Sequence, residues 1–130
     1  MVHNVMNFPW PFDDESASEI RASDLLEHLP THTREYESTY IKFVEEAYRI
    51  LEPSGILWIQ TPRFDSPNLP IDLGHVKGFH ERSMDYFDES TDLGRDYGYY
   101  TACKFKVDAV VTESLNIQFT MTKLADDGDA

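Results

Sequence analysis

A glutamate and a histidine, Glu27 and His28, adjoin each other directly after a short run of residues that favours a strand. An imidazole titrates close to neutral pH, so a histidine at this position can accept a proton from a reacting group. We therefore take His28 as the candidate catalytic residue and Glu27 as a candidate substrate contact. Local packing of the pair, without any catalytic role, is the alternative.

The histidines and carboxylates do not have the spacing of a metal site. His75 and Asp72 lie close together in one long loop. His28 and His32 are four residues apart, but Pro30 between them breaks the helix that would align their side chains. A zinc site needs three or four converging ligands, and no tight ligand spacing is present. The sequence predicts no metal site.

Three consecutive elements would position these residues. Apolar residues recur every three or four positions over Arg34–Leu51, which predicts an amphipathic helix. Ile56–Thr61 opens with a nearly continuous apolar run, typical of a buried parallel strand with helices on both faces. With a short strand at Glu19–Ser23, these elements predict a βαβ unit with a right-handed crossover.

The segments on either side of this unit are shorter. Val2–Val5 is expected to form a short strand, and Arg82–Phe87 a short helix. Residues 62–80 form a long loop rich in proline and glycine, and loops of that length are usually functional or disordered.

Near the end of the chain, Phe105–Thr112 and Asn116–Lys123 alternate in a way that predicts an antiparallel hairpin. We expect residues 1–124 to form one partial domain of the α/β class. Residues 125–130 have nothing to bury and should form a disordered acidic tail.

Composition excludes several function classes. The net charge of −13 disfavours direct binding to nucleic acid, whose backbone requires a basic surface. No apolar run is long enough to span a membrane, and the first residues lack the order of a secretory signal. The single cysteine, Cys103, fits a reducing compartment. We expect a cytoplasmic protein.

Three segments resemble small class I S-adenosylmethionine-dependent methyltransferases, in the same order along the chain. Trp10–Leu29 contains a passage similar to their "LPF-D…FD-I-AS-VLEHL" segment. Phe43–Leu57 resembles their "E-RVLKPGG-L" passage, and His75–Ser83 resembles "HVRFFT-S". The resemblance covers roughly residues 4–123. It implies a truncated Rossmann-like methyltransferase sheet, in which parallel strands with a crossover helix lead to an antiparallel hairpin.

The glycine-rich turn of that family is absent from these 130 residues. In the family, a Gly-x-Gly-x-Gly turn after the first strand lets the backbone approach the cofactor, and an acidic residue after the second strand takes the ribose hydroxyls. The glycines here are scattered, at positions 55, 74, 78, 94, 98 and 128. The resemblance therefore implies S-adenosylmethionine as the cofactor, with a site that is incomplete in this chain.

The resemblance places candidate cofactor-binding residues at Asn4, Ser23 and Leu25. Asn4 would take the adenine-binding position, with an ordinary turn residue as the alternative. Ser23 and Leu25 would lie beside the methionine part, although serine is also a typical helix cap. Ligands of open α/β sheets bind at the carboxyl ends of the strands. Arg63 and His75 are therefore candidate substrate residues, together with Glu27.

Two functions from different classes follow. The first is an S-adenosylmethionine-dependent methyltransferase that is active only when another chain or subunit supplies the missing strands. The second is a non-catalytic binding or structural protein that works through oligomerisation. In both, the strand at Glu19–Ser23 has an exposed edge, which proteins rarely leave unprotected. We expect Val2–Val5 or another subunit, for example in a homodimer, to cover it.

Overall fold

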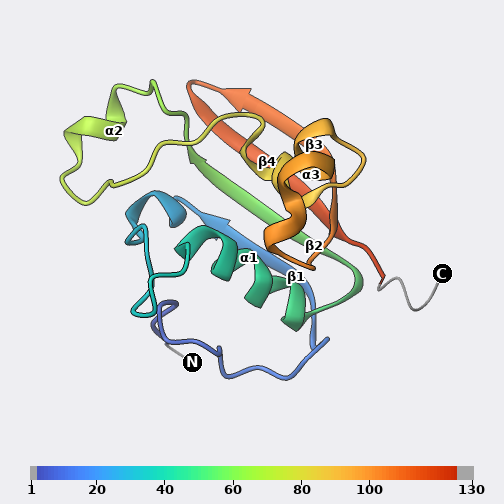
Figure 1. Ribbon diagram of the computed structural model, residues 1–130. Helices are drawn as coiled ribbons and strands as arrows, with labels where there is room; N and C mark the ends of the chain where they lie inside the picture. Colours follow the sequence, from blue (N-terminus) through green and yellow to red (C-terminus); the bar gives the residue numbers. More distant parts are fainter. Residues whose placement is uncertain (1–2, 126–130) are drawn as a thin grey trace.

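The computed structural model describes residues 3–125 as an α/β fold built on a four-stranded mixed sheet (Figure 1). The strand order is β1-β2-β4-β3, with bounds β1 Ala17–Ser23, β2 Leu51–Pro62, β3 Phe105–Glu113 and β4 Asn116–Lys123. β1 and β2 are parallel and are joined through helix α1, Thr39–Ile50, whereas β4 is antiparallel to both of its neighbours. The predicted truncated Rossmann-like sheet with a terminal hairpin is confirmed.

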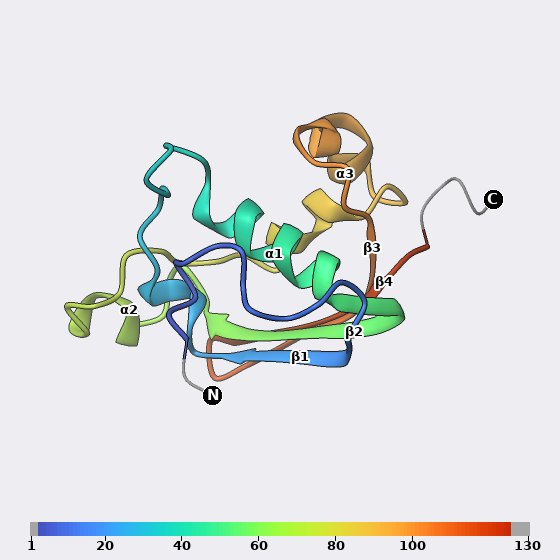
Figure 2. The ribbon, with the colours of Figure 1, turned by 90° about the horizontal axis from the view of Figure 1, so that it is seen from below.

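The helices cover only one face of this sheet. Figure 2 shows α1 and α3, Asp92–Tyr97, on the same side of the strands, and no helix of the described residues lies on the other side. Leu57 and Ile59 of β2 face α1 and are fully buried, whereas Ile56 on the opposite face is 38% exposed. The expectation of helices on both faces of this strand is therefore wrong for the described part of the chain.

Helix α1 supplies the apolar layer above the sheet. Its buried side chains recur every three or four residues, as the helical period requires: Phe43, Val44, Ala47 and Ile50. They pack against buried residues of the strands, which include Leu57, Ile59, Phe105, Ile117, Phe119 and Met121. Because the side chains of α1 and those of the strands form one buried cluster, the core lies between α1 and the centre of the sheet.

The helix starts later than the sequence predicts. Ser38 is its N-cap, and the Ser38 hydroxyl accepts a hydrogen bond from the backbone N–H of Ile41 at 3.4 Å. The predicted start at Arg34 is wrong because Tyr36 has a positive φ of 61°, which a right-handed helix excludes.

The long loop and the hairpin follow their predictions closely. Residues 62–80 carry only one helical turn, α2, Asn68–Ile71, and the predicted helix at Arg82–Phe87 is the 3₁₀ helix η2, Ser83–Phe87. The hairpin turn consists of Ser114 and Leu115, both with positive φ, as a two-residue turn between twisted strands requires.

The N-terminal segment does not form the expected strand. Residues 3–5 have no strand partner, and the backbone N–H of Asn7 donates to the carbonyl of Asn4 in a turn. Residues 1–2 and the expected tail at 126–130 lie outside the described residues. Among the residues that are described, no helix has the length and apolar character needed to cross a bilayer.

A buried carboxylate fastens this segment to α1 instead. Glu46 accepts hydrogen bonds from the backbone N–H of Trp10 at 2.6 Å and from Arg49 at 2.7 Å. Arg49 also donates to the carbonyls of Trp10 and Phe12. Burial alone would raise the pKa of Glu46, but the bonds from Arg49 and Trp10 and the charge of Arg49 outweigh it, so the pKa lies below its ordinary value.

We expect Glu46→Gln to lower the free energy of unfolding at pH 7 by about 2 kcal/mol, because the half-buried guanidinium of Arg49 loses its charged partner. A carboxyl whose pKa is depressed by folding stabilises the fold above its unfolded pKa of about 4.3 and loses this contribution as the pH falls through the folded value. Urea unfolding of both proteins should therefore show a constant difference at neutral pH that shrinks below about pH 4.

The matched control is Glu52→Gln, which removes the same charge from an exposed position just beyond α1. It should change the unfolding free energy by less than about 0.5 kcal/mol. Equal effects of the two substitutions at pH 7 would show that the Glu46 network does not hold the N-terminal segment.

Candidate functional site

The carboxyl ends of β1 and β2 lie side by side and point toward the long loop (Figure 1). Ser23 is the register partner of Gln60, and the next residue, Asp24, donates its backbone N–H to the Gln60 carbonyl at 2.9 Å. The Gln60 amide faces the Asp24 carboxylate at 3.3 Å and accepts from Gln118 of β4 at 2.9 Å. Polar groups of three strands therefore converge where ligands of α/β sheets bind.

Glu27 lies inside this end of the sheet. It belongs to the 3₁₀ helix η1, Leu26–His28, and its side chain is only 1% exposed. Its Oε1 accepts a hydrogen bond from the buried hydroxyl of Thr61, at 3.0 Å. Its backbone carbonyl accepts from the N–H of Val76, at 2.8 Å. These two bonds fix η1 to the end of β2 and to the long loop.

The Val76 bond brings His75 to the pair Glu27 and His28. The two imidazole rings meet edge to face, with centroids 4.5 Å apart. His28 Nε2 lies 3.9 Å from a Glu27 carboxylate oxygen, and one ligand atom from each of the three residues lies within 4.8 Å of the others. Asp72 Oδ2 lies 3.5 Å from His75 Nε2. The structure thus gathers three of the predicted site residues, which we call the Glu27 cluster.

The side chains of two other predicted residues, Asn4 and Arg63, interact with groups outside the Glu27 cluster. Asn4 is exposed, and its side-chain oxygen accepts from the backbone N–H of Met6 at 2.9 Å, so this side chain closes its own turn. The Arg63 guanidinium is held by the carboxylates of Glu81 and Asp65. Bonds from Thr112 and Arg63 lower the pKa of Glu81 to about 2, so this ion pair stays charged. The predicted roles of Asn4 and Arg63 in binding remain predictions.

Ser23 and Leu25 lie in different surroundings. Ser23 is exposed and makes no capping bond to η1, whose N-cap is Leu25 and has no side-chain cap. Leu25 lines a cavity of about 550 Å³ along the unpaired edge of β1. We call this the edge cavity, and its residues are His3, Val5, Trp10, Phe12, Ser16, Ala17, Glu19, Ile20, Arg21, Ala22, Leu25, Phe43 and Ile50.

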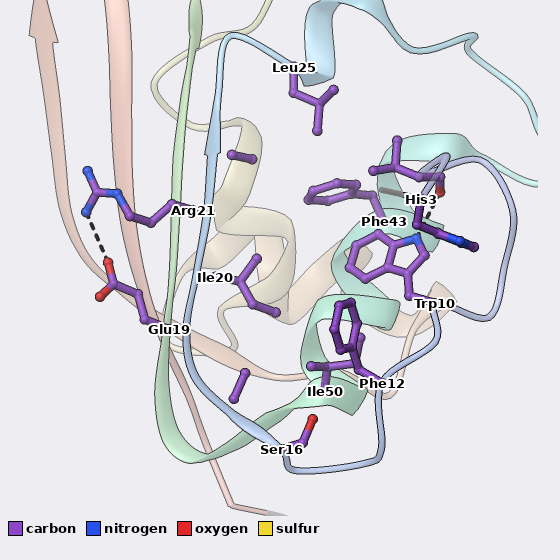
Figure 3. Close-up of a pocket in the computed structure, with 13 residues that line it drawn as sticks. His3, Trp10, Phe12, Ser16, Glu19, Ile20, Arg21, Leu25, Phe43 and Ile50 are labelled. Atoms are coloured by element: carbon purple, nitrogen blue, oxygen red, sulfur yellow. Dashed lines mark hydrogen bonds and ion pairs between the residues drawn. The ribbon is translucent and has the colours of Figure 1, made fainter. Parts of the chain in front are cut away.

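The edge cavity is mainly apolar (Figure 3). Ile20, Phe43 and Trp10 point into it from the strand, from α1 and from the N-terminal segment. Glu19 and Arg21 turn to the other side of β1, where they form an exposed ion pair at 3.0 Å. The adenine, ribose hydroxyls and charged amino-acid part of S-adenosylmethionine need several polar partners. The cavity offers few such partners: of its polar lining residues, Glu19 and Arg21 point away, which leaves His3 and Ser16.

The strand edge beside this cavity is open in the described residues. Among the described residues, β1 pairs only with β2, so the backbone groups of its other edge have no strand partner. An added strand would satisfy those groups and place its apolar side chains on Ile20 and Phe43. The expected cover by Val2–Val5 is wrong for the residues described, because His3 and Val5 line the cavity and residues 3–5 do not pair with β1.

Sequence reasoning missed Phe43 and Trp10 as parts of this site. The spacing of Phe43, Ala47 and Ile50 on the helix was a usable signal for the buried face. Nothing local indicates that Trp10 reaches Phe43, against which its ring packs edge to face at 5.2 Å.

Comparisons with known proteins support the fold only. No protein-family model matches the chain, and no curated protein matches it significantly. A solved structure described as a SAM-dependent methyltransferase from Archaeoglobus fulgidus is similar, with a TM-score of 0.62 and 13% sequence identity. The match covers 95% of this chain and 66% of that one. The chain therefore has the fold of a truncated methyltransferase sheet and spans about two thirds of its structural neighbour.

Proposed function

We propose that the chain is a methyltransferase-like protein that acts in S-adenosylmethionine-dependent methyl transfer only when another chain or subunit completes its sheet. The observation that carries this proposal is the unpaired edge of β1, with the apolar edge cavity beside it. The similar archaeal structure, described as a SAM-dependent methyltransferase, supports the same class of function.

This chain and the completing chain would supply different groups to the cofactor site. The cofactor requires more polar partners than the mainly apolar edge cavity offers, so the others would come from strands paired with β1. This chain would supply the carboxyl ends of β1 and β2, where Asp24 and Gln60 present polar groups. His28 is 38% exposed at the same end, where it would face a methyl acceptor.

The first test compares the chain alone with its native complex. We expect calorimetric titration of the chain alone with S-adenosylmethionine to give no binding heat up to millimolar ligand. A complex isolated from the native source should bind it. Tight binding by the chain alone would show that no completing strand is needed, and a stable complex that binds no cofactor would exclude methyl transfer.

The edge itself is tested by adding one charge to it. Ile20→Glu places a carboxylate among the apolar side chains of the edge cavity, and should reduce both association with the completing chain and cofactor binding by roughly tenfold or more. Ser18→Glu adds the same charge to an exposed position of β1 that does not line the cavity. If both variants keep full cofactor binding, with circular dichroism unchanged, the completing strand does not use this edge.

The alternative is a non-catalytic protein that works through a homodimer. Antiparallel pairing of two β1 edges about Ile20 would set Glu19 of each copy opposite Arg21 of the other, which favours this register. Sedimentation velocity should then show twice the 15.1 kDa chain mass, reverting to monomer with Ile20→Glu but not with Ser18→Glu. A monomer at all concentrations would contradict the dimer.

A further inference from the structure

The Glu27 carboxyl group is buried without a permanent cation beside it. Its side chain is 1% exposed, and its hydrogen bond comes from the neutral Thr61 hydroxyl. Within residues 3–125, no lysine or arginine forms an ion pair with it, and its ionisable partner is His28 at 3.9 Å. A buried carboxylate is costly unless a charged or strongly polar partner compensates it. A bound cation would be such a partner.

The His75 ring is oriented in the way that metal-binding histidines are. Its Nδ1 lies 3.2 Å from the backbone carbonyl of Leu69. A carbonyl only accepts, so a hydrogen bond here requires the proton on Nδ1, and a neutral ring then has its lone pair on Nε2. Donation of the second ring nitrogen to a carbonyl is the usual way in which proteins fix a metal ligand. The side chain is 10% exposed, so this orientation is held by its surroundings.

His28 approaches the same point from the solvent side. The donor atoms of Glu27, His28 and His75 lie within 4.8 Å of one another. Ligand atoms of a tetrahedral ion with bonds of about 2.1 Å lie about 3.4 Å apart. Metal binding would therefore require the donor atoms to move closer, and His28 is the most exposed side chain of the three. Asp72 is placed beside the cluster, with its Oδ2 at 3.5 Å from His75 Nε2.

We propose that Glu27, His28 and His75 bind a divalent transition-metal ion. Two imidazoles and a carboxylate suit Zn²⁺, Mn²⁺ or Fe²⁺, whereas Mg²⁺ and Ca²⁺ prefer oxygen ligands alone. Three protein ligands leave a coordination position for water or an oxygen of a substrate, as in catalytic rather than structural sites.

The ligands come from segments that the sequence separates. Glu27 and His28 follow β1, and His75 lies in the loop that follows β2. Gly74 lets that loop pass close by, because a Cβ at this position would lie 3.1 Å from His28 Nδ1 and 3.2 Å from Asp72 Oδ1. The predicted absence of a metal site rested on local spacing, which does not detect ligands on different elements. Binding of the ion by this chain does not depend on the proposed function.

The test uses the full chain without an affinity tag, freed of metal by a chelator and titrated with Zn²⁺ or Mg²⁺ in a calorimeter. We expect one equivalent of Zn²⁺ to bind at micromolar or lower concentration, with Mg²⁺ at least about a hundredfold weaker. His75→Gln and Glu27→Gln should each weaken Zn²⁺ binding by at least roughly tenfold, because each removes a direct ligand and loss of an outer-shell partner alone has an effect of that size. The amide oxygen introduced by Glu27→Gln can still accept the Thr61 hydrogen bond, so this variant should fold.

His32→Ala is the matched control, because it removes an exposed histidine outside the cluster. It should leave Zn²⁺ affinity unchanged. Paramagnetic Mn²⁺ gives a readout of position: it should broaden the imidazole NMR signals of His28 and His75 before those of His32 and His80. The proposal is overturned if no stoichiometric Zn²⁺ binding occurs, if the control weakens binding as much as His75→Gln, or if the four histidines broaden together.

Discussion

The pairing of β2 on both of its edges is the constraint on which the rest of the structure depends. β2 holds β1 through a parallel ladder and β4 through an antiparallel one, and both ladders use its residues 56–60. A shift of one residue would turn Leu57 and Ile59 out of the core and expose them. The same strand reaches Thr61, whose hydroxyl fixes Glu27. The register that buries the core therefore also sets the geometry of the Glu27 cluster.

The other side of β1 has only a partial cover. Trp10 is 8% exposed and packs on Phe43, and the Glu46–Arg49 network holds its backbone in place. The N-terminal segment thus shields the apolar face next to β1 without offering hydrogen bonds to the strand itself. A cavity remains between segment and strand because one tryptophan does not fill the space of a full element.

Local patterns predicted the elements, and contacts between elements decided the site. β1, β2 and the hairpin are recognisable because alternation and apolar runs are properties of neighbouring residues. The strand expected at Val2–Val5 does not form over residues 3–5, because a turn bond from Asn7 to Asn4 sets their backbone. The approach of His75 to His28 depends on the hydrogen bond between Val76 and Glu27, which no spacing in the sequence encodes.

The edge cavity and the Glu27 cluster include residues that are close together in the chain. Leu25 lines the cavity, and Glu27, two residues later, belongs to the cluster. Occupants of the two sites would influence each other only if η1 had two arrangements of similar energy. Backbone bonds from Asp24 to the Gln60 carbonyl and from Val76 to the Glu27 carbonyl hold η1 at both ends. With η1 held in this way at both ends, we expect the two sites to bind their occupants independently.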